Sequence, residues 1–141
     1  MKNVVVAIRE ADDCRGALER VIELARSEPV RVHLLTVRAP LSQYVTRFLP
    51  AESVHALHDE EGRKVLEPAA RMLERAGIPH QAHVRVGYKA ELIVSFAREF
   101  HCDKIMLCER PEGLIARLQL GTIAGQIRHL LQAAHPGCEL V

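Results

Sequence analysis

The chain alternates between short apolar runs and longer segments in which apolar residues recur at helical spacing. The first run, NVVVAI at residues 3–8, is rich in β-branched residues, which is typical of a strand buried on both faces. The next segment, DDCRGALERVIELARSE, carries one apolar stripe, and Asp12 or Asp13 is the expected N-cap residue. The pattern therefore predicts a strand followed by a helix at the start of the chain.

The same alternation continues to the last residues. Further strands are expected at 30–37, 80–86 and 103–108 and in the closing CELV, with helices at 51–76, 89–100 and 118–134. Gly77 marks the end of the second of the four helices, and Pro68 is expected to bend or break it. Strands separated by helices pair in parallel through crossovers. We therefore predict an α/β fold: a single doubly wound domain, residues 1–141, with helices on both faces of an open sheet.

Composition and charge narrow the class of protein. The 141 residues are 48% apolar, enough for one domain with one substantial core. Because the chain has 19 basic and 18 acidic residues, its net charge is too small to create an electrostatic field that attracts nucleic acid or an anionic membrane. No apolar run approaches the roughly 18 residues of a spanning helix, and the start of the chain does not resemble a signal peptide. We expect a cytoplasmic protein without nucleic-acid or membrane partners, and protein partners stay open.

The residues that could bind metal or form disulfides are scattered. The cysteines are Cys14, Cys102, Cys108 and Cys138. Without a Cys-x-x-Cys pair, they are expected to be reduced thiols rather than disulfide or zinc ligands. The closely spaced histidines are His55 with His58 and His80 with His83. Neither pair has a third ligand at suitable spacing, so surface histidines and no metal site are predicted.

Several segments together carry a resemblance that none of them carries alone. These are VRVG before an Ala-Glu helix, CDKIMLC as the fourth strand, Gly121-Thr122 at the start of the last helix, and the closing CELV. In order and spacing they resemble the universal stress protein family over essentially the whole chain. The resemblance implies a five-stranded parallel sheet in order 3-2-1-4-5 and a homodimer paired through the C-terminal strand. An exposed edge strand is a separate physical reason for such pairing.

The resemblance also implies a test for nucleotide binding. ATP-binding members carry Gly, two residues, Gly, nine residues, Gly and then Ser or Thr after strand four, because backbone amides must approach phosphate oxygens. Gly121 and Thr122 match the last pair, but Pro111 and Cys108 stand at the two earlier glycines. Pro111 has no N–H to donate, and Cys108 carries a Cβ. The alternative role of Thr122 is that of a plain helix N-cap.

The ends of strands one and two complete the candidate site. Arg9 stands where ATP-binding members place an acidic residue for the adenine and ribose end, while Val37 keeps an apolar residue that can face adenine. The candidate cofactor-binding residues of this degenerate site are therefore Gly121, Thr122, Val37 and Arg9. We consider two roles for Arg9: an ion pair with Glu109 across the cleft, or a joint site with Arg110 or Arg117 for a smaller anion.

Two functions follow from the resemblance. The first is a non-catalytic stress-response or signalling module that binds no cofactor. The alternative is a member that binds ATP or another adenine nucleotide, such as AMP, and acts as a nucleotide-dependent switch or a slow ATP hydrolase. The missing glycines favour the first. No nucleophile elbow, Walker loop or pair of catalytic carboxylates stands at a strand end, so no catalytic residue is assigned.

Overall fold

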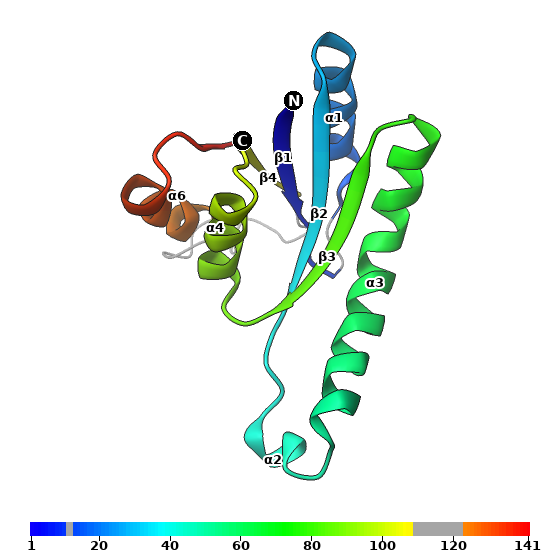
Figure 1. Cartoon of the computed structure of the whole chain (residues 1–141), viewed down its shortest axis with the longest axis vertical. Helices are drawn as coiled ribbons and strands as arrows, with labels where there is room; N and C mark the ends of the chain where they lie inside the picture. The colour runs from blue at the N-terminus through cyan, green and yellow to red at the C-terminus, as the bar shows by residue number, and fades with distance from the viewer. Residues whose placement is uncertain (11–12, 109–122) are drawn as a thin grey trace.

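The computed structural model describes residues 1–10, 13–108 and 123–141, and five strands from these residues form one parallel sheet (Figure 1). The elements are β1 (Lys2–Ala7), α1 (Arg15–Ser27), β2 (Val30–Arg38), α2 (Gln43–Thr46), α3 (Ala51–Arg75), β3 (His80–Val86), α4 (Lys89–Glu99), β4 (Lys104–Leu107), α6 (Ile123–Ala134) and β5 (Glu139–Leu140). The strand order is β3-β2-β1-β4-β5. The predicted fold class and sheet order are confirmed.

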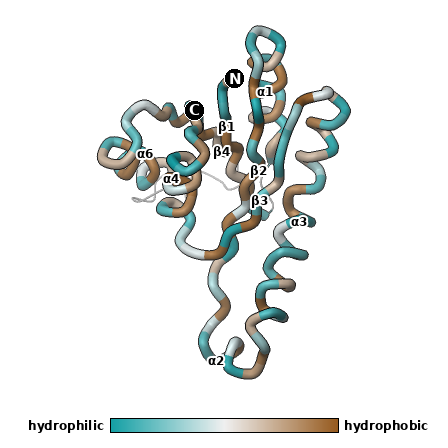
Figure 2. The backbone as a smooth tube through the Cα atoms, viewed as in Figure 1, coloured by the Kyte–Doolittle hydropathy of each residue, from teal (hydrophilic) through white to brown (hydrophobic). Residues whose placement is uncertain are grey.

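Helices cover both faces of the sheet, and each face has its own apolar core (Figures 1 and 2). In β1, Val4 and Val6 face the core formed with α1 and α3, whereas Val5 and Ala7 face the core formed with α4 and α6. Successive side chains of a strand point to opposite faces, so a strand covered on both sides must be apolar throughout. Burial on both faces therefore explains why the apolar run at residues 3–8 is continuous.

The long helix α3 rules out one of the two effects predicted for Pro68, a break in the helix, and the predicted bend stays a prediction. It runs from Ala51 to Arg75 with Pro68 inside it, so the proline does not break the helix. Pro68 lies on the exposed side of α3, where the carbonyl one turn earlier can bond water in place of the missing N–H. Gly77 has φ +71°, the left-handed conformation expected after a helix end.

A glycine sets the distance between α3 and the sheet. A Cβ added to Gly62 would lie 2.5 Å from Cγ1 and 2.6 Å from Cγ2 of Val84 in β3. Valine is stiff at its branched Cβ, so it cannot swing aside to make room. Gly62 therefore permits a close approach that any larger residue would prevent.

The start of α1 also differs from the prediction. Cys14 is the N-cap residue, and its side chain makes no capping hydrogen bond. Asp13 stands one position earlier, where its Oδ1 accepts a hydrogen bond of 3.2 Å from the backbone N–H of Arg15. Asp12 lies outside the described residues. Asp13 thus binds the first turn from outside the helix and is not its cap.

Two regions of the fold, the segment around α2 and the sheet edge at β5, have few neighbouring elements. The short helix α2 and the first turns of α3 extend beyond the sheet (Figure 1), and Tyr44 and Phe48 there are each 69% exposed. At the edge of the sheet opposite β3, β5 pairs with β4 through Lys104↔Glu139 and Ile105↔Leu140.

Within the described ranges, no helix is both long enough and apolar enough to cross a membrane.

Candidate functional site

Two of the predicted site residues meet where β1, β2 and β4 end. Arg9 follows β1, Val37 lies near the end of β2, and both line a small pocket on the α4 and α6 face of the sheet. Cys108, directly after β4, and Ile123, the first residue of α6, line the same pocket. The winding of the sheet reverses between β1 and β4, which is the place where open α/β sheets bind ligands. The pocket lies at the position that the sequence predicts.

The other two predicted residues cannot be compared with the prediction. Gly121 and Thr122 precede Ile123 and lie outside the described residues, as do Glu109, Arg110, Pro111 and Arg117. Both hypotheses for Arg9 therefore stay predictions. Arg9 itself is partly buried and lines this pocket as well as a second one on the other face of the sheet.

The small pocket is nearly filled by the protein's own side chains. Its volume is about 10 Å³, whereas pockets for drug-sized ligands measure about 300–1,000 Å³. Val37 is only 7% exposed and belongs to the apolar core that α4 and α6 form with the sheet. Ile93 of α4 lines the pocket and is buried in the same core. Among the described residues, the space beside Val37 holds no more than a water-sized group.

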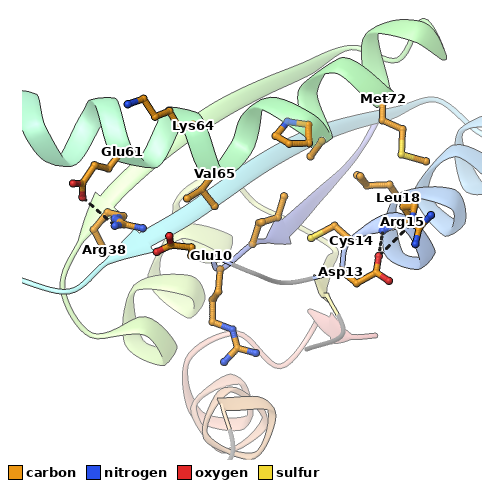
Figure 3. A pocket seen from close by; sticks show the side chains of 14 residues that line it. Glu10, Asp13, Cys14, Arg15, Leu18, Arg38, Glu61, Lys64, Val65 and Met72 are labelled. Atoms are coloured by element: carbon orange, nitrogen blue, oxygen red, sulfur yellow. Dashed lines mark hydrogen bonds and ion pairs between the residues drawn. The ribbon is translucent and has the colours of Figure 1, made fainter. Parts of the chain in front are cut away.

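A larger cavity opens on the opposite face, between the start of α1 and the middle of α3 (Figure 3). Its volume is about 600 Å³. Apolar side chains line it, among them Ile8, Leu18, Val65, Ala69 and Met72. Charged side chains of both signs also line it: Arg9, Arg15, Arg38, Lys64, Glu10, Asp13 and Glu61. The cavity is therefore an apolar hollow with mixed charges around it.

Ion pairs connect several of these charged groups. Nη2 of Arg38 lies 3.1 Å from Oε2 of Glu61, and Nε of Arg15 lies 3.6 Å from Oδ1 of Asp13 (Figure 3). The Arg15 side chain is 82% exposed and the Arg38 side chain 20%. The Arg15–Asp13 pair is open to water and contributes about 0–1 kcal/mol, so it can exchange partners at little cost, whereas the Arg38 guanidinium is largely shielded from water.

A disulfide between Cys14 and Cys108 corrects the prediction of four reduced thiols. The two Cα atoms lie 4.7 Å apart although 94 positions separate the residues in the chain. The spacing rules for cysteine look only at nearby residues, whereas here the fold brings the start of α1 beside the end of β4. Cys14 is partly exposed and lines the larger cavity, while Cys108 is 7% exposed and lines the small pocket.

The other two cysteines agree with the prediction. Cys102 and Cys138 are free and buried. Burial, with the nearby Cys138 and Asp103, raises the pKa of the Cys102 thiol to about 12. Burial, with Asp103 and Glu139, raises the pKa of Cys138 to about 11. Both stay protonated near neutral pH and are therefore poor nucleophiles.

The histidines correct the sequence analysis in two ways. His58 is 6% exposed, so it is a buried residue of α3 and not a surface histidine. His83 pairs with His33 of the neighbouring strand: Nδ1 of His33 lies 3.1 Å from Nε2 of His83. Phe96 of α4 and Phe100, the residue after α4, cover the pair, with ring centroids 4.8 Å from His83 and 4.9 Å from His33, respectively. The alternating pattern of β3 was visible in the sequence, but its register against β2 was not.

The surroundings of His33 and His83 favour the neutral form of both imidazole rings. Burial and then Arg31 lower the pKa of His33, whereas burial, His33 and Arg85 together lower the pKa of His83 to about 4. One ring must donate and the other accept across the 3.1 Å contact, which two imidazolium rings cannot do. Elsewhere in the described part of the chain, no group of three or more potential ligands could hold a metal ion.

The low pKa values of His33 and His83 lead us to expect that the protein loses stability in mild acid. The unfolded chain takes up protons near the ordinary histidine pKa of 6.5, but folded His83 does so only near 4, so stability falls as pH drops from 6.5 to 4. We expect a decrease of about 1–2 kcal/mol, less than the full shift implies because His83 is partly open to solvent. Urea unfolding across this range measures it.

Two histidine variants identify the source of that pH dependence. His83→Gln should flatten the stability profile between pH 4 and 6.5, whereas His55→Gln, at an exposed position of α3, should leave its slope unchanged. An equal slope in the wild type and in His83→Gln would show that the histidine pair is not responsible.

The strand order defines a doubly wound α/β protein, and the small pocket lies at the switch point between β1 and β4. The chain matches the model of the universal stress protein family over residues 1–132, and it belongs to that family. The family expected from the sequence is confirmed.

Known proteins similar to this chain support the assignment. A universal stress protein of Methanocaldococcus jannaschii is 26% identical over 130 residues, which are 89% of this chain and 75% of the relative. A family protein from Burkholderia pseudomallei has a TM-score of 0.69 at 19% identity, covering 99% of this chain and 93% of that one. A family protein from Arabidopsis thaliana, solved with AMP bound, has a TM-score of 0.65 at 18% identity, covering 100% and 90%. The two structures show that the fold is shared.

Proposed function

We propose that residues 1–141 form one universal stress protein domain that acts as a non-catalytic stress-response or signalling module, with a cleft that no longer holds an adenine nucleotide. The observation that carries this proposal is the small pocket. Its volume is about 10 Å³ at the place where Arg9, Val37 and Cys108 meet. An adenine ring entering there would have to displace core side chains that α4 packs against the sheet.

Chemistry at the ends of β1 and β4 supports the same proposal. Arg9 offers donors where the nucleotide-binding pattern has a carboxylate acceptor for the adenine and ribose end. Cys108 occupies the position of the first glycine of that pattern, and its disulfide joins it to Cys14 at the start of α1. A phosphate loop needs backbone free to approach the ligand, and this bond fixes the first residue of the loop to a different element.

Nucleotide binding is the alternative, and two observations favour it. The Arabidopsis relative was solved with AMP bound, and Gly121-Thr122 keeps the last part of the phosphate pattern. On this alternative the chain is an ATP- or AMP-dependent switch or a slow ATP hydrolase. It requires the small pocket to open by movement of α4 or of the side chains that fill it.

A thermal-shift titration decides between the two functions. On protein stripped of bound ligand, we expect ATP and AMP at millimolar concentration, with and without magnesium, to leave the unfolding midpoint unchanged. A ligand at 100 times its dissociation constant adds about 2.7 kcal/mol and raises the midpoint by several degrees. The AMP-binding relative is the positive control. A nucleotide-specific rise in this chain would establish the alternative.

We also propose a homodimer paired through β5, which is the last strand of the sheet. The backbone N–H groups of Glu139 and Val141 donate to the carbonyls of Asp103 and Ile105, at 2.9 and 2.8 Å. The N–H of Leu140 between them therefore points away from β4, toward the open edge. A second copy of the strand could pair with this edge.

Light scattering after size-exclusion chromatography tests the dimer. We expect a mass twice the 15.8 kDa of one chain. Leu140→Pro removes the outward N–H together with the leucine side chain and should shift the mass toward the monomer, whereas Leu140→Ala shortens the side chain but keeps that N–H and should stay dimeric. A wild-type monomer at micromolar concentration, or a dimer that Leu140→Pro leaves intact, would contradict pairing through β5.

A further inference from the structure

We propose that the 600 Å³ cavity binds a small peptide thiol carrying two carboxylates and an ammonium group, which exchanges with the disulfide at Cys14. This site lies on the α1 and α3 face, opposite the small pocket considered for nucleotide. The proposal does not depend on whether nucleotide binds. It assigns a redox modification site to Cys14 and a ligand class to the larger cavity.

The position of the two sulfur atoms decides where a thiol can attack. Cys14 lines the open cavity beside Asp13 and Arg15, with α3 on the opposite side (Figure 3). Cys108 is 7% exposed, packs in the core on the α1 and α3 face and lines the small pocket, but it does not line the cavity. Thiol–disulfide exchange requires access to one sulfur along the axis of the bond. The attacked sulfur is therefore Sγ of Cys14, with Sγ of Cys108 as the leaving group.

The lining of the cavity fits a ligand with charges of both signs. Arg15, Arg38 and Lys64 can receive carboxylates, while Glu10 and Glu61 can receive an ammonium group. The Lys64 side chain is 72% exposed and lies 3.5 Å from Glu60, so it can turn to a ligand without leaving a buried charge unpaired. A ligand with charges of both signs could therefore pair with cations and carboxylates of the same lining.

The apolar part and the size of the cavity fit the same ligand. Val65 and Met72 of α3 are only partly buried and line the cavity, where they offer an apolar surface for the methylene groups of the thiol. A volume of about 600 Å³ lies within the usual range for small-molecule sites. An uncharged thiol of two carbons would find no charge to pair with and would fill little of this space.

The exchange is a balanced substitution at sulfur. The ligand thiolate forms a bond to Sγ of Cys14 as the Cys14–Cys108 bond breaks, and Cys108 leaves as a thiolate that takes up the proton lost by the ligand. The products are a mixed disulfide on Cys14 and a free thiol on Cys108. A second ligand thiol can attack the ligand sulfur and release the ligand as its disulfide, so that two thiols supply the two electrons that reduce both cysteines.

Exchange would break the covalent link between Cys108, which follows β4, and Cys14, at the start of α1. Cys108 lines the small pocket with Arg9, so the state of the disulfide reaches the face where nucleotide was expected. The thiol site and the small pocket lie on different faces of the sheet, and Ile8 and Arg9 line both of them.

The test uses the oxidised full-length protein and glutathione as the probe. We expect peptide mass mapping to find the mixed disulfide on Cys14 and a free thiol on Cys108, and the rate to saturate as glutathione is raised. With 2-mercaptoethanol, an uncharged thiol, the rate should rise linearly. An adduct on Cys108, an unsaturable rate with glutathione, no exchange, or four free thiols in protein purified without reductant would each overturn the proposal.

Charge variants test the cavity itself. Lys64→Gln and Arg38→Gln should each slow exchange with glutathione by about ten-fold, the effect of losing one charge-assisted hydrogen bond, and leave the rate with 2-mercaptoethanol unchanged. Arg71→Gln is the matched control, because Arg71 lies on α3 outside the cavity and pairs with Glu67. Equal effects of Lys64→Gln and Arg71→Gln would attribute the loss to general charge and would contradict a binding site.

Discussion

Reduction of the Cys14–Cys108 disulfide is expected to lower the free energy of unfolding by about 2–4 kcal/mol. The bond closes a loop across 94 positions of the chain, and a loop of that length restricts the unfolded state far more than the folded one, where both residues are already held. Urea unfolding of the same oxidised preparation, with and without reductant, measures the difference.

Cys14→Ser provides the control for this measurement. The variant should unfold at the midpoint of the reduced wild type and should not respond to reductant, because Cys102 and Cys138 are buried free thiols. Equal stability of the oxidised and reduced wild type would mean that the bond adds nothing to the fold.

Leu66→Ala is expected to lower the free energy of unfolding by about 2–5 kcal/mol. Leu66 is 1% exposed and packs in the core that α1 and α3 form with the sheet, so its truncation leaves a cavity in addition to the lost burial. Leu57, nine residues earlier on the same helix, is 39% exposed because that part of α3 extends beyond the sheet.

Leu57→Ala is the matched variant, with the same change of side chain and a similar helical environment. It should cost less than about 1 kcal/mol, because surface substitutions have small effects. The two variants are compared by urea unfolding at one pH. A similar loss for both would show that the first turns of α3 are packed against something in solution that covers Leu57.

Much of the fold is determined by local patterns that the sequence displays. The apolar run at residues 3–8 is buried on both faces, and Gly77 ends α3 with a positive φ. Both effects depend on a few neighbouring residues, so periodicity and glycine placement are enough to predict them. Val37 and Arg9 could be placed at one edge because parallel strands end at the same edge.

Features that depend on contacts distant in sequence could not be predicted. Cys14 meets Cys108 through the pairing of β1 with β4, and His33 meets His83 through the register of β2 with β3. Pro68 is tolerated because it faces solvent, which periodicity alone did not determine. The sizes of the small pocket and of the larger cavity depend on how α3 and α4 pack against the sheet, and short sequence motifs do not predict that packing.

The disulfide bears on the predicted cytoplasmic location. Stable disulfides are rare in a reducing cytoplasm, where those that occur are usually transient, catalytic or redox-sensing. A cytoplasmic location is therefore compatible with this bond where thiols can open it. The cavity beside Cys14 supplies the access that such opening requires.

The bond between Cys14 and Cys108 also makes a covalent ring of most of the chain. The ring passes through α1, β2, α2, α3, β3, α4 and β4, and it includes the exposed segment around Tyr44 and Phe48. A protease that cuts the backbone in that segment would nick the ring without dividing the molecule. The nicked protein would migrate as one species until the disulfide is reduced, and only then as two fragments.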